Sequence, residues 1–461
     1  MKRDWQGKKV VVIGAARQGL AASRYLAKKS AKVLLTDSRP LSDFTDLEAQ
    51  LSGFQVELFL GGHPDEILDG ADMVCVSGGV PLTIPTIKEA QTRGIPLTND
   101  AQLFMEEVDA KVIGITGSAG KTTTTVLTGA IAKAALEPKV KVWVGGNIGY
   151  PLIEHLEEIR PEDWIVHEFS SFQLEQMTLS PHIAVITNIT PNHLDRHKTM
   201  EAYTAAKTRI LDFQSAQDFA VLNREDPGSS NLPEKTKASI LTFGFSAPAG
   251  KIPGVYIKEG NFLVFDGQNE TILFPTNILK LPGKHNVANA MAACAACHAA
   301  GFSAQSMSEG IGSVEGIPHR LEMVGEFNGI QWINDSIATA PERVMAAMRA
   351  LEGPLVMLLG GRDKDLPWLE LAAMLHERQP KAVLFGEAGS LISAALNEYE
   401  GASPSYPLFQ VNTLKEAVMK AAEIAEIGDK VLLSPGGTSY DAYRDFEERG
   451  EHFRNLVKAL K

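Results

Sequence analysis

The segment KVIGITGSAGKTTTTVLTGAIAKAAL (111–136) decides the fold class, because it runs from a buried strand through a glycine-rich turn into a helix. Glycines let backbone N–H groups turn around phosphate oxygens, the helix N-terminus adds a positive dipole end, and Lys121 adds a full charge. The spacing G-x-x-x-x-G-K-[ST] is not met, because Ile115 occupies the first glycine position, but the shorter G-x-x-G-K-T is met. A tight turn without a ligand is the alternative, and the Lys-Thr pair disfavours it. The predicted phosphate loop consists of Gly117, Ser118, Ala119, Gly120, Lys121, Thr122 and Thr123.

Strands and helices alternate on both sides of this loop, which is typical of parallel sheets covered by helices on both faces. Residues 225–280 interrupt the alternation with short β-rich runs, and an Ala-rich helix is expected over 285–301. We therefore predict an α/β fold of three domains. They are a Rossmann-like domain over 1–109, a central P-loop ATPase-like domain with a parallel sheet over 110–315, and a second Rossmann-like domain over 316–461.

Composition excludes several classes of protein. The chain has 461 residues, a formal net charge of −12 and 44% hydrophobic residues, which fits a globular protein of several domains. The negative charge disfavours non-specific binding to nucleic acid. Three cysteines argue against a disulfide framework, and no segment reads as a membrane span or a secretory signal. We expect a cytoplasmic protein without membrane insertion.

A second glycine loop, Gly14-Ala-Ala-Arg-Gln-Gly19, follows the first predicted strand, and Asp37 ends the second. The pattern is similar to a dinucleotide-binding fingerprint, but Ala16 replaces the middle glycine and would hinder the approach of a pyrophosphate. NAD is therefore disfavoured, although a nucleotide of some kind fits this crevice.

Polar residues gather after two strands of the central region. Glu168 ends the strand DWIVHEFS (163–170), and a carboxylate there, across from a phosphate loop, suits Mg²⁺. NHLDRH (192–197) follows the next strand; a capped turn, zinc ligation and contact with phosphate or Mg²⁺ are the alternatives, and the mixed charges favour the last. Lys207 lies in the following helix, where a lysine ordinarily belongs to a solvated face.

The Ala-rich helix contains two residue pairs, and we expect only the first of them to bind a ligand. Asn286 and Asn289 are three residues apart, so they share a helix face and suit hydrogen bonds to a base or ribose. Cys294 and Cys297 form C-x-x-C without a second pair, so we interpret them as small core residues rather than as metal ligands.

Taken together, these segments resemble the Mur ligase family over essentially the whole chain. TGSAGKTTT (116–124) resembles the family's ATP loop, HEFSSFQLE (167–175) its Mg²⁺ segment and GGNIG (145–149) its substrate turn. SPGGTSYDAYRDFEERG (434–450) resembles the C-terminal signature of the members that add D-glutamate. The resemblance implies an ATP- and Mg²⁺-dependent ligase of peptidoglycan precursor synthesis, expected to act as a monomer. Its small-molecule substrates would be UDP-N-acetylmuramoyl-L-alanine and D-glutamate.

The resemblance also implies roles for individual residues. Lys121, His193 and Lys207 would be catalytic, with Lys207 carried as a carbamate, and Thr122, Glu168, His193 and the carbamate would hold Mg²⁺. Besides the phosphate loop, ATP would contact Asn286, Asn289, Arg320 and Asp335. The UDP-sugar would contact Asp37, Ser38, Arg39 and Asn147, and D-glutamate would contact Lys364, Ser439 and Phe446.

Three features depart from the family pattern, and one of them, a Thr in place of the usual Ser-Thr pair after the ATP loop, is conservative. Ser118-Ala119 replaces the usual Thr-Asn, and Ile337 replaces a lysine that D-glutamate-adding members usually have, which leaves the strictness of amine specificity open. Three other readings stay open. They are a folylpolyglutamate-type or other Mur-type ligase, an NAD-dependent oxidoreductase, and a non-catalytic nucleotide-binding subunit.

Overall fold

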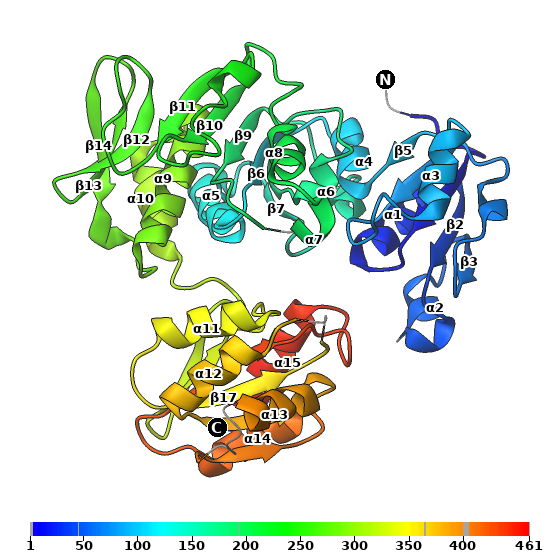
Figure 1. Cartoon of the computed structure of the whole chain (residues 1–461). Helices are drawn as coiled ribbons and strands as arrows, with labels where there is room; N and C mark the ends of the chain where they lie inside the picture. The colour runs from blue at the N-terminus through cyan, green and yellow to red at the C-terminus, as the bar shows by residue number, and fades with distance from the viewer. Residues whose placement is uncertain (1–2, 45, 193, 364–365, 400–404, 461) are drawn as a thin grey trace. The chain divides into compact units, whose positions relative to one another are not determined.

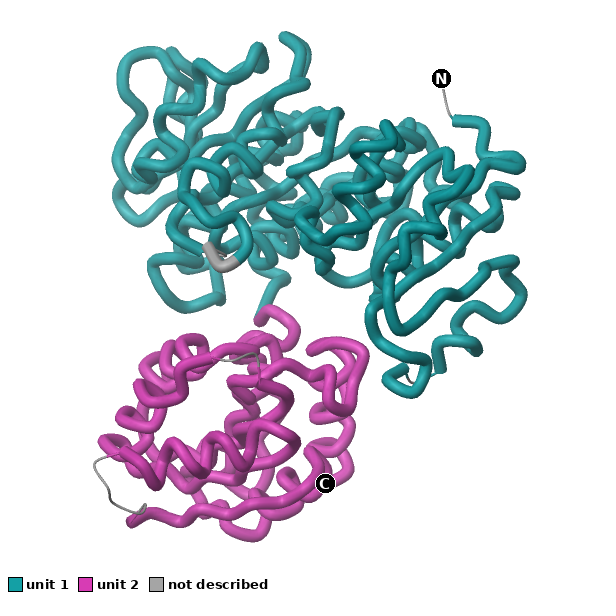
Figure 2. The backbone as a smooth tube through the Cα atoms, turned by 45° about the vertical axis from the view of Figure 1, so that its right-hand side comes forward, with its two compact units in different colours: residues 1–315 teal, residues 316–461 magenta. Residues whose placement is uncertain are grey.

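The chain divides into two compact units in the computed structural model, residues 1–315 and 316–461 (Figure 2). The structure describes residues 3–44, 46–192, 194–363, 366–399 and 405–460. These residues form three sheets, of which the first unit holds two and the second unit one (Figure 1). The prediction of an α/β fold with parallel sheets is confirmed, while the domain boundaries near 109 and 315 stay predictions.

The first sheet is parallel throughout, with the strand order β3-β2-β1-β4-β5. Its central strand is buried on both faces, because alternate side chains enter different cores: Val10 and Val12 pack in one cluster, Val11 and Ile13 in another. The elements are β1 Lys9–Ile13, α1 Arg17–Lys28, β2 Lys32–Asp37, α2 Leu47–Gln50, β3 Val56–Leu60, β4 Met73–Val76, α3 Pro85–Thr92, β5 Leu97–Thr98 and α4 Asp100–Glu107.

The central sheet has nine strands in the order β14-β13-β12-β11-β10-β9-β6-β8-β7. Its strands are β6 Lys111–Thr116, β7 Val142–Gly146, β8 Trp164–Glu168, β9 Ile183–Ile186, β10 Phe219–Asn223, β11 Ser239–Phe243, β12 Gly254–Lys258, β13 Asn261–Phe265 and β14 Glu270–Pro275. Its helices are α5 Lys121–Leu136, α6 Ser171–Leu174, α7 Leu194–His197, α8 Met200–Thr208, α9 Lys284–Ala299 and α10 Ala304–Ser313. The loops after β6, β8 and β9 leave the same edge, because these strands are parallel neighbours.

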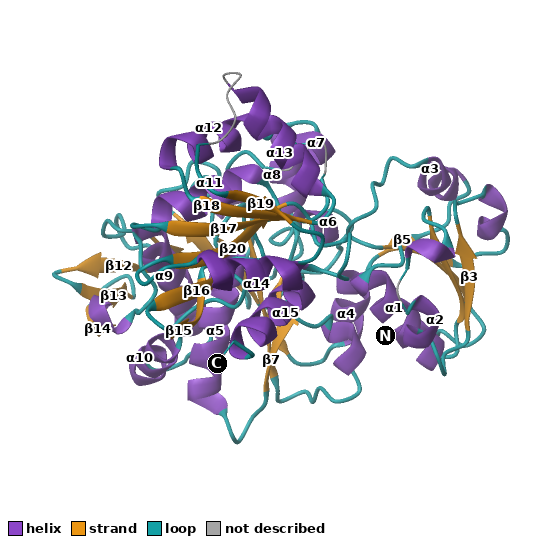
Figure 3. Ribbon diagram, turned by 90° about the horizontal axis from the view of Figure 1, so that it is seen from below, coloured by secondary structure: helices purple, strands orange, loops and turns teal. Residues whose placement is uncertain are grey.

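The β-rich excursion predicted over 225–280 extends this sheet. Strand β12 pairs parallel with β11, β13 pairs antiparallel with β12, and β14 pairs antiparallel with β13. Figure 3 shows the three strands together at one end of the sheet. Short hairpin connections explain the change of direction, because antiparallel neighbours need no crossover helix.

The second unit contains one six-stranded sheet, in the order β15-β16-β20-β17-β18-β19, and only the β15–β16 pair is antiparallel. Leu355, Met357 and Leu359 of β17 pack on one face, and Val356 and Leu358 on the other. The strands are β15 Glu322–Phe327, β16 Ile330–Asn334, β17 Leu355–Gly360, β18 Lys381–Phe385, β19 Leu408–Gln410 and β20 Lys430–Gly436. The helices are α11 Pro341–Ala350, α12 Leu369–Arg378, α13 Ala388–Glu398, α14 Leu414–Ile424 and α15 Phe446–Lys458.

Two expectations from the sequence concern the protein interior. Cys294 and Cys297 are fully buried in α9, which confirms their interpretation as core residues. Among the helices of the described residues, none is long and apolar enough to span a membrane.

Candidate functional site

The predicted phosphate loop joins the end of β6 to the start of α5. Gly117 and Gly120 adopt φ values of +152° and +82°, which favour glycine. Packing also requires glycine here, since a Cβ atom on Gly117 would lie 1.8 Å from Thr187 Oγ1, and one on Gly120 would lie 2.2 Å from Asn289 Oδ1. Local conformation and distant neighbours therefore both select the glycines of this loop.

Side chains that follow β9 brace the loop. The Asn188 side chain accepts from the Ala119 N–H at 2.9 Å, and Thr187 Oγ1 donates to the Ala119 carbonyl at 2.6 Å. The buried Tyr203 hydroxyl donates to Ser118 Oγ at 3.0 Å. The sequence patterns did not single out Thr187, Asn188 or Tyr203. For Thr187 and Asn188 the available signal was their place just after a buried strand, at the edge where parallel strands form sites.

Lys121 directs its amine back toward the loop. Its Nζ donates to the Gly117 carbonyl at 2.9 Å and to the Ser118 carbonyl at 3.4 Å. Carbonyl oxygens are weaker partners for an ammonium group than phosphate oxygens. The side chain is thus placed where it can bind a phosphate held by the loop.

Glu168 lies at the end of β8 and is 1% exposed. The Thr122 hydroxyl donates to one carboxylate oxygen and the Asn147 amide to the other, each at 2.9 Å. A hydroxyl and a carboxylate in contact offer the oxygen ligands that Mg²⁺ prefers. Among the described residues there is no group of three or more His, Cys, Asp or Glu side chains that could hold a metal ion. The predicted ligand His193 lies outside the described residues.

Lys207 is buried, although the helix pattern alone favours a solvated lysine. Only 1% of the residue is exposed, its Nζ donates to the Gly117 carbonyl at 2.8 Å, and it lies 4.8 Å from the centroid of the Tyr203 ring. Burial lowers the pKa of Lys207 well below its ordinary range, the nearby Lys121 charge lowers it further, and Glu168 partly opposes both. These surroundings disfavour the charged form of the Lys207 amine beside the phosphate loop.

Asn286 and Asn289 share one face of α9, as predicted. The Asn289 amide donates to Asn286 Oδ1 at 3.3 Å. The contact of Asn289 with the backbone at Gly120 places this face beside the phosphate loop. The structure therefore gathers Gly117, Lys121, Thr122, Glu168, Lys207 and the asparagine pair at one edge of the central sheet.

The residues predicted at the first glycine loop form a separate cluster. Asp37 accepts the Ala15 N–H at 2.8 Å and two hydrogen bonds from the Arg39 guanidinium at 3.0 Å, whereas Ser38 is exposed. Burial raises the pKa of Asp37, but the hydrogen bonds from Arg39 and Ala15 outweigh it and hold the pKa below its ordinary value. Arg17 connects this loop to the turn after β7, since it donates to the Asn147 carbonyl at 3.1 Å.

The residues predicted in the second unit lie where β16 and β20 end. Asp335 accepts from the Ser434 hydroxyl at 2.9 Å and from the Leu321 N–H at 3.2 Å, and burial raises its pKa to about 6. Ser439 is buried, and the Ser336 hydroxyl donates to the Phe446 carbonyl at 2.8 Å. The positive charge of Arg320 lowers the pKa of Asp335, against the effect of burial. Lys364 lies outside the described residues.

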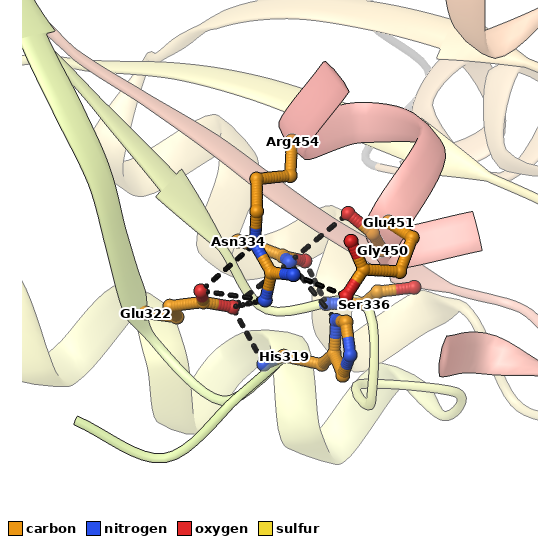
Figure 4. A network of polar contacts seen from close by, with 7 residues as sticks. All are labelled: His319, Glu322, Asn334, Ser336, Gly450, Glu451 and Arg454. Carbon is orange, nitrogen blue, oxygen red and sulfur yellow. Dashed lines mark hydrogen bonds and ion pairs between the residues drawn. The ribbon is translucent and has the colours of Figure 1, made fainter. Parts of the chain in front are cut away.

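A polar network fixes the turn before β15 against α15 (Figure 4). Glu322 accepts from the His319 N–H at 2.8 Å, from the Asn334 amide at 3.1 Å and from the Arg454 guanidinium at 2.7 Å. Asn334 also donates to the His319 ring at 3.1 Å. The network holds the position of Arg320, the residue next to His319.

A glycine-rich loop between a strand and a helix, with Lys121 and the Thr122–Glu168 pair beside it, is typical of proteins that bind nucleotide phosphates. The Mur ligase middle domain matches residues 115–297, the N-terminal domain of the Mur ligase MurD-like type matches residues 8–99, and the glutamate ligase domain of Mur ligases matches residues 319–437. The chain belongs to the Mur ligase family.

Curated relatives match over the full length. The UDP-N-acetylmuramoylalanine–D-glutamate ligase of Pelotomaculum thermopropionicum is 39% identical and covers 100% of both chains. The protein of the same name from Symbiobacterium thermophilum is 38% identical and covers 98% of both. Among solved structures, the UDP-N-acetylmuramate-alanine ligase of Thermotoga maritima has a TM-score of 0.58 at 19% identity, covering 98% of this chain and 100% of its own, which supports the fold alone.

Proposed function

We propose that this chain is an ATP-dependent ligase that joins the amine of D-glutamate to the L-alanine carboxylate of UDP-N-acetylmuramoyl-L-alanine. Relatives that are 38–39% identical from end to end bear the name of this activity. The single structural observation that carries the proposal is the convergence of Lys121, Thr122, Glu168 and Lys207 on one phosphate loop.

The chemistry follows from the weakness of a carboxylate as an electrophile. The L-alanine carboxylate attacks the terminal phosphorus of ATP, and ADP leaves, which gives an acyl phosphate. The D-glutamate amine then attacks the acyl carbon and loses a proton, and the tetrahedral intermediate expels phosphate to form the amide. The protein's task is to position the reactants and to neutralise phosphate charge.

Residues at the central sheet edge divide this task. Lys121 binds phosphate oxygens, the loop N–H groups orient them, and Asn286 and Asn289 contact the adenosine side. Glu168, Thr122 and His193 would hold Mg²⁺, which supplies neutralisation of phosphate charge when bound. The donors fit this ion, because the Glu168 carboxylate and the Thr122 hydroxyl already meet at 2.9 Å.

Lys207 has a second role in the proposal. Burial lowers the pKa of its amine and so favours the uncharged form, which adds to carbon dioxide and loses a proton to give a carbamate. The carbamate adds oxygen ligands beside the loop, whereas an ammonium group would repel a cation there.

The remaining candidate residues bind the other two substrates. Asp37, Ser38 and Arg39 contact the uridine part of the UDP-sugar and Asn147 the sugar side. Arg17, which donates to the Asn147 carbonyl, supplies positive charge for the diphosphate between them. Arg320 and Asp335 contact ATP, and Lys364, Ser439 and Phe446 contact D-glutamate. The enzyme acts as a monomer in the cytoplasm, without nucleic acid or membrane insertion.

Phosphate release tests this function. The enzyme is incubated with ATP, Mg²⁺ and UDP-N-acetylmuramoyl-L-alanine, and the amine is D-glutamate, L-glutamate, L-lysine or meso-diaminopimelate. We expect release with D-glutamate alone. Release with another amine would reassign the amino-acid pocket, and no release with any amine would remove the ligase proposal in favour of a non-catalytic nucleotide-binding subunit.

A further inference from the structure

The amino-acid substrate of the proposed reaction requires positively charged partners in its binding site. D-glutamate carries two carboxylates, and carboxylates in binding sites are recognised by cationic side chains, above all by the arginine fork. The carboxyl ends of the parallel strands β16, β17 and β20 form the ligand edge of this unit. The arginines at this edge differ in how far their charge is already used.

Two of these arginines are committed to the protein itself. Arg449 is fully buried and donates to the hydroxyl and carbonyl of Ser336 and to the carbonyls of Gly437 and Thr438. Arg362 forms a two-point ion pair with Glu387 at 2.8 and 2.9 Å. Both side chains hold loops together, so neither guanidinium is available to a substrate without breaking those contacts.

Arg343 differs from both. It is exposed on the first turn of α11 and donates to the Ile337 carbonyl at 3.3 Å, and its charge lowers the pKa of Asp335, although it forms no direct ion pair with any of the described residues. Helix stability does not explain a cation at this position, because a positive charge in the first turn opposes the helix dipole.

The loop that Arg343 contacts is part of the same edge. Ile337 follows Ser336, whose hydroxyl donates to the Phe446 carbonyl, and Arg449 links Ser336 to the carbonyl of Thr438, next to Ser439. The isoleucine side chain itself brings no charge to this loop. The Arg343 guanidinium, which donates to the Ile337 carbonyl, brings a positive charge to the loop.

We propose that Arg343 is a specificity-determining residue that binds a carboxylate of the amino-acid substrate and supplies the positive charge that Ile337 lacks. The inference rests on the proposed ligase function and identifies a residue of its amine site. Arg343 leaves the Ile337 carbonyl when the carboxylate binds, exchanging a neutral acceptor for a charged one. A charge-assisted hydrogen bond contributes about 1.5–3 kcal/mol, which corresponds to roughly 10- to 100-fold in affinity.

Steady-state kinetics with the full chain test the inference, with phosphate release as the readout. We expect Arg343→Ala to raise the KM for D-glutamate at least about tenfold, while the KM values for ATP and UDP-N-acetylmuramoyl-L-alanine stay within about twofold. Arg343→Lys should restore part of the loss, and so should Ile337→Lys in the Arg343→Ala background. Arg349→Ala is the matched control, because Arg349 is exposed on the last turn of the same helix.

The outcomes separate this inference from the function on which it rests. If the wild type is active with D-glutamate and Arg343→Ala keeps its KM within about twofold, with an unchanged Tm, Arg343 does not bind the substrate. An equal rise of all three KM values would show a structural role instead and overturn the inference. A wild type without turnover on D-glutamate would remove the proposed function and this inference together.

Discussion

The two glycine loops of the first unit have the same strand–turn–helix form but differ in the charged side chains around the turn. In the loop at Gly14, the Asp37 carboxylate accepts the Ala15 N–H at 2.8 Å and two hydrogen bonds from the Arg39 guanidinium, and the nearby Arg17 donates to the Asn147 carbonyl. In the loop at Gly117, Lys121 directs its ammonium toward the loop, and the buried Lys207 amine, whose pKa is lowered, donates to the Gly117 carbonyl. From this comparison we infer that the side chains around the turn, and not the glycines that both loops share, decide which phosphate group each loop accepts.

Among the substitutions considered, removal of Lys121 from the Gly117 loop should have the largest effect. Lys121→Ala deletes the charge aimed at the transferred phosphate, and we expect kcat to fall by about 10³-fold or more, in the range that loss of a key phosphate contact causes. The Tm should stay within a few degrees, because the hydrogen bonds of the amine to the Gly117 and Ser118 carbonyls lie within the loop itself. Phosphate release and thermal unfolding provide the two readouts; a near-normal rate would end the assignment of the phosphate loop.

Replacing the first glycine of each loop with alanine tests how tightly each loop is packed. A Cβ atom on Gly117 meets Thr187 Oγ1 at 1.8 Å, while one on Gly14 meets the Val80 side chain at 2.7 Å. We expect Gly117→Ala to lower the free energy of unfolding by about 2–4 kcal/mol and Gly14→Ala by less. Gly7→Ala, at φ +72° with nothing within 4 Å, is the control for backbone strain alone. Equal losses in all three variants, measured by denaturant unfolding, would contradict this account.

The smallest effect concerns pH. The pKa of Asp37 is lowered in the folded state, so Asp37 contributes stability that is present above the ordinary aspartate pKa of about 4 and is lost as the pH falls through the folded pKa. Asp37→Asn removes this contribution. We expect the variant to be less stable at neutral pH and to lose less stability than the wild type on acidification below about pH 4. Identical pH profiles of the free energy of unfolding would show that Asp37 is not held by Arg39 and Ala15.

Local patterns predicted some of these features and missed others. The phosphate loop, the shared face of Asn286 and Asn289 and the burial of Cys294 and Cys297 all follow from residue type and helical spacing, which depend on neighbours in sequence. The burial of Lys207 and the bracing of Ser118 by Tyr203 depend on contacts 85–90 residues apart in the chain, and no periodicity encodes those. The contact of Arg343 with Ile337 became visible only once the turn into α11 was placed.

The most direct test of the central claim is equilibrium binding of ATP·Mg²⁺ and of UDP-N-acetylmuramoyl-L-alanine, each measured separately on Lys121→Ala and on Arg17→Ala by isothermal titration calorimetry. If the two loops serve different substrates, Lys121→Ala should weaken ATP binding at least about tenfold and leave the UDP-sugar unaffected, since one charge-assisted contact contributes that much. Arg17→Ala should show the reverse pattern. Loss of both ligands in either variant, or loss of ATP binding in Arg17→Ala alone, would contradict the division of labour between the loops.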